Sequence, residues 1–379
     1  MSYNYSFGVR FVASNVAPTF SKGNAMPTKY VPSLNGLRAL SAGIVIAVHC
    51  HVKNFSIPAP GGQFGVNMFF VLSGFLITLL LLEEERVSTT ISLKKFYFRR
   101  ILRIFPVYYV LLITYYILQI SGVLQFTTNT WLSAIFYVKD VPVPNSNSWE
   151  TDHLWSLSIE EHFYLMWPLI FKFLKSYRIK IAVFFIILIP IVRGVLYDPD
   201  GEGLMIYERA DALLWGCILA IYYRPVSTIM MRGINKYKWA IALPFLGLFL
   251  SVVALKFLPV KNSFAEGLIR ALGRADGTVT NIFICLVIVI AVNSRNSLFY
   301  KFLNTDSMNY LGKLSYSLYI WQQLFFSSTI GLWGLFPLNI VCIVAVSVFS
   351  YHLIEKPFLK IKSRYEVKNA APRLARRAA

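Results

Sequence analysis

An apolar run near the start of the chain carries a single formal charge. Residues 34–52 read LNGLRALSAGIVIAVHCHV, in which Arg38 is the one Lys, Arg, Asp or Glu. At about 1.5 Å per residue, these nineteen residues can cross the hydrocarbon core of a bilayer as a helix. Arg38 and His49 are eleven residues apart, which is three turns plus about 20°. They therefore lie on one stripe of the helix, roughly 16 Å apart along its axis.

The arginine in this run has two interpretations. A charged side chain inside a bilayer costs roughly 3 kcal/mol on insertion scales unless it faces protein, water or a ligand. Arg38 can be a side chain that reaches back to the membrane surface, with His49 simply packed in a helix bundle. Alternatively, both residues belong to a polar path across the membrane. The run alone does not distinguish the two.

The composition excludes an ordinary soluble domain. Of the 379 residues, 56% are hydrophobic and only 15% are charged, with a mean hydropathy of +0.56. Several runs are long enough to span a bilayer, which indicates a polytopic, all-α membrane protein. The net charge of +19 fits basic loops that face an anionic cytoplasmic leaflet better than a nucleic-acid partner. The four cysteines each lie within an apolar run, which predicts neither disulfides nor a metal site.

Ten stretches are predicted to be transmembrane helices. They lie at 34–52, 64–82, 101–120, 155–174, 179–197, 207–223, 238–258, 279–293, 314–333 and 338–355. Lysine and arginine gather in alternate loops, at 83–100, 175–180, 224–238 and 294–313, and again after 355. Because basic loops stay on the cytoplasmic side, both termini are expected in the cytoplasm, as an even number of spans requires. This divides the chain into a cytoplasmic N-terminal tail at 1–30, a transmembrane domain at 31–358 and a basic cytoplasmic C-terminal tail at 359–379.

The cytoplasmic end of the third predicted span is rich in arginine. Its sequence, FYFRRILRIFPVYY, contains Arg99, Arg100 and Arg103. Arg99 and Arg103 are i,i+4 neighbours, so one helix face presents two guanidinium groups that can bind phosphate oxygens in a forked geometry. The alternative is ordinary anchoring of a span by positive residues.

The fourth predicted span begins with an unusual set of polar residues, in the sequence HLWSLSIEEHFYLMWP. Glu160 and Glu161 cannot both face lipid, and both are expected at about the depth of His49. Ser156 and His153 lie on the same helix face as Glu160. Adjacent acids within a span favour a functional role over a structural one.

Arg209 and Asp211 lie in the outer part of the sixth predicted span. Residues two apart point to different sides of a helix, so these two are expected to pair with other helices rather than with each other. A structural ion pair between helices and a role in binding substrate are both open interpretations.

Together these stretches resemble the membrane acyltransferase-3 family of bacterial O-acyltransferases. The resemblance covers about residues 30–360 and rests on NGLRAL followed by His49, on GVNMFFVLSGFLIT, FRRILRIFP and HLWSLSIEEHFYLMWP, and on RADALLWG, LGKLSYSLYIW and EKPF. It implies a ten-span enzyme of the bacterial inner membrane that moves an acyl group, usually acetyl, from cytoplasmic acyl-CoA to a sugar hydroxyl at the outer side. Two positions depart from the family pattern: Asn67 stands where relatives often have aspartate, and Gln322 where they commonly have histidine.

The resemblance also implies roles for the polar residues. The essential arginine and histidine of the family match Arg38 and His49, and its glutamate motif matches Glu160 and Glu161. Its arginine-rich motif, associated with the acyl-CoA end, matches the three arginines of the third span. The residues expected to bind the carbohydrate or glycoconjugate acceptor are Asn67, Ser156, His153, Arg209 and Asp211.

Two mechanisms are compatible with these assignments, with acetyl-CoA as the expected donor. His49 can remove the proton from the acceptor hydroxyl as a general base, with Glu160 or Glu161 orienting the imidazole. Alternatively, His49 accepts the acyl group first and passes it on. A proton-coupled transporter or exporter is the second hypothesis, because intramembrane Arg, His and Glu residues also mark ion paths.

Overall fold

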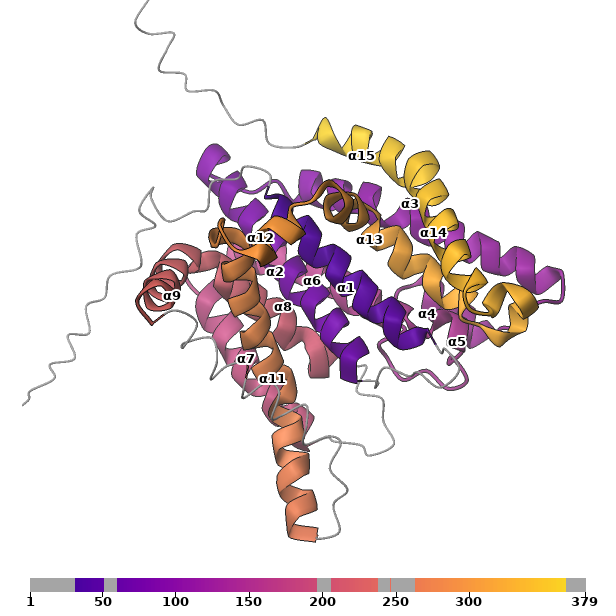
Figure 1. Ribbon diagram of the computed structural model, residues 1–379, viewed down its shortest axis with the longest axis horizontal. Helices are drawn as coiled ribbons and strands as arrows, with labels where there is room; N and C mark the ends of the chain where they lie inside the picture. Colours follow the sequence, from indigo (N-terminus) through magenta and orange to yellow (C-terminus); the bar gives the residue numbers. More distant parts are fainter. Residues whose placement is uncertain (1–30, 51–59, 196–205, 238–245, 247–262, 366–379) are drawn as a thin grey trace, which may run out of the picture.

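A computed structural model describes residues 31–50, 60–195, 206–237, 246 and 263–365, and this part of the chain consists of helices and turns without a strand (Figure 1). The all-α prediction is therefore confirmed for these residues. The expected N-terminal tail, nearly all of the predicted seventh span and the chain beyond 365 lie outside the described residues.

The helices of the first half follow in the order α1 (Pro32–His49), α2 (Pro60–Ser88), α3 (Leu93–Ile120), α4 (Thr128–Ile135), α5 (Trp149–Asp152), α6 (Leu154–Phe173) and α7 (Arg178–Val195). The second half contains α8 (Ile206–Ile221), α9 (Tyr223–Tyr237), α11 (Ser263–Asn293), α12 (Leu298–Leu303), α13 (Asp306–Phe325), the 3-10 helix η2 (Ser328–Gly334), α14 (Leu338–Ser350), the π-helical turn η3 (Tyr351–Glu355) and α15 (Lys356–Ser363). Each predicted span within the described part overlaps a helix. The ninth is displaced, because its helix begins at Asp306, after an N-cap in which Thr305 accepts from the Met308 backbone.

Helix α1 lies in the middle of the bundle, between α2 and α13 (Figure 1). It begins at Pro32, whose fixed φ suits a first helical position. Helix α13 runs alongside it in the same direction, because Ser315 contacts Arg38 and Gln322, seven residues further on, contacts His49. Two segments far apart in the sequence thus share one seam along the core of the protein.

Helices α2 and α8 approach each other backbone to backbone. A Cβ atom added at Gly74 would collide with the backbone of Leu213, and one added at Gly216 would collide with the backbone of Val71. Only glycine permits such a close approach at these positions. The contact holds α8 against α2, and the chain then bends by 85° into α9.

Ion pairs tie the end of α2 to its neighbours. Glu84 binds Arg99 of α3, with 2.7 Å between carboxylate and guanidinium. Glu85 binds Arg178 of α7 at 3.0 Å and Lys175 at 2.8 Å. This cluster therefore fixes three helices at the end that the sequence places on the cytoplasmic side.

Three helices in the described part are long and apolar enough to cross a membrane: Gly62–Ser88, Leu93–Ile120 and the continuous Leu338–Ser363. The bent pair formed by α8 and α9 would make a fourth. Ten spans and the orientation of the termini stay predictions. Helices such as α1, α6 and α13 carry buried polar side chains, which lower their mean hydropathy even though they lie in the same bundle.

The glycine contact between α2 and α8 generates a prediction about stability. We expect Gly74→Ala to lower the free energy of unfolding by about 1–3 kcal/mol, because the added methyl group forces the two backbones apart. Gly43→Ala in α1 is the matched control: nothing lies within 4 Å of its added Cβ, so the substitution should be neutral or stabilising by about 0.5–1 kcal/mol. Thermal unfolding in detergent measures both, and equal melting temperatures for the two variants would contradict the packing argument.

Candidate active site

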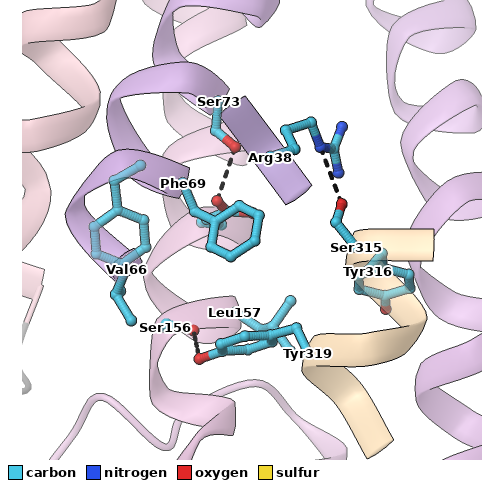
Figure 2. A pocket seen from close by; sticks show the side chains of 11 residues that line it. Arg38, Val66, Phe69, Ser73, Ser156, Leu157, Ser315, Tyr316 and Tyr319 are labelled. Atoms are coloured by element: carbon cyan, nitrogen blue, oxygen red, sulfur yellow. Dashed lines mark hydrogen bonds between the residues drawn. The ribbon is translucent and has the colours of Figure 1, made fainter. Parts of the chain in front are cut away.

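Arg38 opens on a small cavity between α1, α2, α6 and α13 (Figure 2). Its Nε donates to the Oγ of Ser315, 3.3 Å away. The polar side chains around the cavity are Arg38, Ser73, Ser156, Glu160, Ser315, Tyr316 and Tyr319, and apolar residues such as Phe69 and Leu157 complete the wall. The first predicted functional residue therefore lines a cavity between helices.

Glu160 lies across this cavity from Arg38. It accepts hydrogen bonds from Ser73 at 2.8 Å and from Tyr164 at 3.2 Å. Its charge acts favourably on the Arg38 guanidinium. Nearby, Ser156 and Tyr319 form a hydroxyl pair at 2.6 Å. The cavity thus combines a cation, an anion and several hydroxyl groups within an apolar bundle.

Glu355 is a second acid near Arg38, and the sequence analysis assigned it no role. It is 1% exposed and accepts a hydrogen bond from Ser317 at 3.1 Å. The charges of Arg103 and Glu355 both act on Arg38. Glu355 ends the π-helical turn η3, a rare geometry that is frequent at functional sites. The available signal was a glutamate at the end of a highly apolar span, within the EKPF motif.

His49 is the last residue of α1, and its ring contacts α13. Its Nδ1 lies 3.2 Å from the Oε1 of Gln322, whose side chain is fully buried. An amide oxygen only accepts hydrogen bonds, so with Oε1 as the partner Nδ1 is the donor in this contact. The indole of Trp149 stands edge-to-face against the imidazole, with 5.8 Å between centroids. Gln322 and Trp149 thus orient the imidazole at this end of α1.

We expected Glu160 or Glu161 to contact His49, but the imidazole contacts Gln322. Gln322 accepts from the imidazole, whereas both oxygens of Glu160 are bonded beside Arg38. Glu161 points elsewhere, since adjacent helix residues differ by about 100°. Its Oε1 is buried and has no hydrogen-bond partner among the described residues.

The three arginines of α3 have different surroundings. Arg99 is buried in its ion pair with Glu84 and also donates to the backbone oxygen of Tyr365 at 3.1 Å. Arg100 lies over the ring of Tyr164, with 4.7 Å from its guanidinium carbon to the centroid. Arg103 makes no hydrogen bond or ion pair with a residue in the described ranges, and it lies near Arg38. Of the three, Arg99 is therefore engaged in the fold, and the shared role of the three arginines at the acyl-CoA end stays a prediction.

Asp211 belongs to a buried ion pair between helices. Its carboxylate binds Arg193 of α7 at 2.7 Å and accepts from Asn281 of α11 at 3.3 Å. The prediction that it pairs with another helix is confirmed. The charge of Arg209, two residues earlier in the same helix, acts favourably on it. This arrangement favours the structural interpretation of Asp211, and a substrate role for either residue stays a prediction.

The remaining predicted residues lie on helices around the seam. His153 is buried, and its Nε2 lies 3.1 Å from the backbone oxygen of Ile320 in α13. Ser156 joins the same helix through Tyr319. Asn67 is buried in α2. These contacts hold α6 against α13 beside the cavity. A role in binding an acceptor stays a prediction for His153, Ser156 and Asn67.

A loop between α4 and α6 lies outside the predicted spans and closes one end of the seam. Its buried Lys139 lies 3.6 Å from the carboxylate of Asp152. Asp152 also accepts from the Ser148 backbone at 3.0 Å. Burial raises the pKa of Asp152 and lowers the pKa of Lys139. The pair holds the loop that carries Trp149.

Comparison with known proteins identifies related sequences. The profile of a family described as "Acyltransferase domain" matches residues 31–352. The chain is 30% identical over 367 residues to O-acetyltransferase OatA of Staphylococcus aureus, covering 88% of this chain and 58% of that protein. It is 28% identical over 370 residues to peptidoglycan O-acetyltransferase OatA of Listeria monocytogenes, covering 88% and 56%. It is 30% identical over 368 residues to the putative peptidoglycan O-acetyltransferase YrhL of Bacillus subtilis, covering 87% and 55%.

The chain thus spans somewhat more than half the length of these curated relatives. No solved structure matches it.

The unequal surroundings of the α3 arginines predict unequal effects on stability. We expect Arg99→Ala to lower the free energy of unfolding by about 3 kcal/mol, because it leaves the buried carboxylate of Glu84 without its partner. Arg103→Ala should change it by less than about 1 kcal/mol. Thermal unfolding in detergent tests both, and the double variant Glu84→Ala/Arg99→Ala should recover part of the loss. Equal destabilisation by the two single substitutions would show that Arg99 has no special structural role.

Proposed function

Because the chain belongs to the acyltransferase domain family, whose profile covers most of its length, we propose that it is a membrane O-acyltransferase for carbohydrate hydroxyl groups. In this proposal acetyl-CoA binds at the cytoplasmic side and the acceptor binds at the outer side. The observation that carries the proposal is the polar seam, the row of side chains from Arg38 to His49 along the contact of α1 and α13. Since one relative is named a peptidoglycan O-acetyltransferase and another a putative one, peptidoglycan is the first acceptor to test.

The donor enters from the arginine end of the seam. Arg103 has guanidinium donors that no described residue uses, and it lies near Arg38, so it suits the phosphates of CoA. The pantetheine arm is slender and carries amide groups, and it runs past the hydroxyls of Ser73, Ser315 and Tyr319. These hydroxyls can exchange hydrogen bonds with the amides inside an otherwise apolar bundle.

His49 performs the proton transfer at the other end. Its Nδ1–H is held by Gln322, so Nε2 accepts the proton of the acceptor hydroxyl as that oxygen attacks the thioester carbonyl. The carbon–oxygen bond forms, the carbon–sulfur bond breaks, and the CoA thiolate takes up a proton. In the alternative route, Nε2 itself attacks the thioester, and the acyl-imidazole then transfers its acyl group to the hydroxyl. The same Gln322 contact serves both routes.

The transporter hypothesis finds no support among the relatives, whose names describe O-acetyl transfer. A direct experiment separates the two classes. Membranes containing the protein are incubated with acetyl-labelled CoA and peptidoglycan fragments, and the label is followed into the carbohydrate. Transfer that depends on the protein supports the enzyme. Absence of transfer to any carbohydrate acceptor offered would overturn it.

The predicted role of His49 can be tested with this assay. We expect His49→Ala to lower turnover by about 10²–10⁴-fold with little change in the apparent KM for acetyl-CoA, because the general base is lost while the donor site is intact. His352→Ala is the matched control, since this histidine is exposed and contacts Tyr310 instead of the seam. Near-normal transfer by His49→Gln would rule out both catalytic routes.

Gln322 should act through His49 as a positioning residue. Gln322→Met keeps a similar volume but removes the amide oxygen, so we expect kcat to fall about tenfold or more while both KM values stay within about twofold. Gln322→Glu keeps an acceptor at this position and should retain more activity than Gln322→Met. If the two variants lose activity equally, the orientation of the imidazole does not depend on this acceptor.

Arg103 should affect the donor alone. A hydrogen bond to a charged group contributes about 1.5–3 kcal/mol, so Arg103→Ala should raise the apparent KM for acetyl-CoA about tenfold or more, with less change for the acceptor. Arg86→Ala is the control, because Arg86 is exposed at the same end and pairs only locally with Glu83 in the described residues. An unchanged donor KM would leave Arg103 without a part in donor binding.

A further inference from the structure

We propose that Trp149 forms the acceptor subsite, in which the indole stacks on a pyranose ring and presents one of its hydroxyls to Nε2 of His49. This inference rests on the proposed function, because it assumes that the imidazole is the acyl-transfer centre. It specifies where the carbohydrate binds, which neither the family profile nor the names of the relatives indicate.

Trp149 is exposed and also contacts the ring of His49, the candidate catalytic residue. The indole is 40% exposed, and its centroid lies 5.8 Å from that of His49. The planes of the two rings are 83° apart, so a flat ligand stacked on the indole would lie nearly perpendicular to the plane of the imidazole. Phe326 flanks the same imidazole at 6.3 Å. An acceptor at Trp149 is therefore within reach of the base.

The chain on both sides of Trp149 is held in place. The neighbouring Glu150 is only 8% exposed, and its two carboxylate oxygens accept from Ser148 at 2.6 Å and from Ser327 at 2.7 Å. Its backbone oxygen accepts from the hydroxyl of Tyr115 in α3 at 2.7 Å. Residues from α3 and from the end of α13 thus converge on the residue next to the indole. Because this backbone is fixed, an exposed aromatic side chain on it loses little conformational entropy when a ligand binds.

The chemistry of the indole suits a sugar. An aromatic ring carries negative charge on its face, and the C–H groups of a pyranose carry small positive charges and form a flat apolar patch. Stacking therefore binds the ring while leaving its hydroxyls at the periphery, where one of them can reach Nε2.

A tryptophan at a membrane surface is often only an anchor in the lipid interface. Trp149 differs from such an anchor because it packs on His49. Trp333 in η2 provides the comparison: it is 58% exposed and has no ring contact or hydrogen bond to another residue in the described part of the chain. Residue 333 follows the same end of α13 that Ser327 occupies, so the two tryptophans belong to the same side of the bundle.

The experiment compares Trp149→Ala, Trp149→Tyr and Trp333→Ala in full-length protein, with acetyl-labelled CoA and muramidase fragments of peptidoglycan. We expect Trp149→Ala to raise the acceptor KM about tenfold, while the donor KM stays within about twofold. Trp149→Tyr should recover most of the loss because it keeps an aromatic face. Trp333→Ala should behave as the unsubstituted protein.

Direct binding of the same fragments, measured by calorimetry without donor, separates the two hypotheses. Weaker binding to Trp149→Ala than to Trp333→Ala supports the subsite whether or not transfer is observed. Equal binding to these two variants, or no binding to the unsubstituted protein, would overturn the subsite. Loss of transfer with binding intact in the unsubstituted protein would instead count against the proposed function.

Discussion

The positive charge of Arg38 lies inside a helix bundle, and the surrounding helices are arranged around it. A cation away from water is stable only where opposite charge and hydrogen-bond acceptors are within reach. Here those groups come from three other helical segments: Ser315 from α13, Glu160 from α6 and Glu355 from η3. The charge therefore sets which faces of these helices turn inward, and the cavity lies where they meet.

The same need for a partner distinguishes charges that hold helices together from charges that can bind a ligand. Arg99, Arg178 and Arg193 each have a carboxylate partner that joins two helices. Removing such a partner would leave a buried charge alone, so these residues belong to the framework. Arg103 has no hydrogen bond or ion pair among the described residues, and it lies toward the opposite end of the polar seam from His49. The proposed transfer uses these two ends, with donor phosphates at one and an acceptor hydroxyl at the other.

Several features followed from the sequence for simple physical reasons. Long apolar runs required helices, since backbone groups must pair within one segment when water is absent. Charged residues within those runs, such as Arg38 and Glu160, indicated the site. A charge inside a membrane span is costly, so it is expected only where the protein needs it for function. Their order along the chain was sufficient for the family resemblance, which the profile match to residues 31–352 confirms.

Partners, in contrast, depended on how separate helices lie against each other. Helical periodicity places His49 on the stripe of Arg38, but it says nothing about the helix opposite, and the imidazole contacts Gln322 where a glutamate was expected. Likewise, periodicity gave Arg99 and Arg103 one common face, and only packing against Glu84 separated their roles. The sequence by itself determined the helices and the polar residues that they carry, because both depend on local periodicity and on the cost of burying charge. Tertiary structure alone decided which polar residues meet, because tilt, register and close glycine contacts between helices are properties of pairs that no single segment encodes.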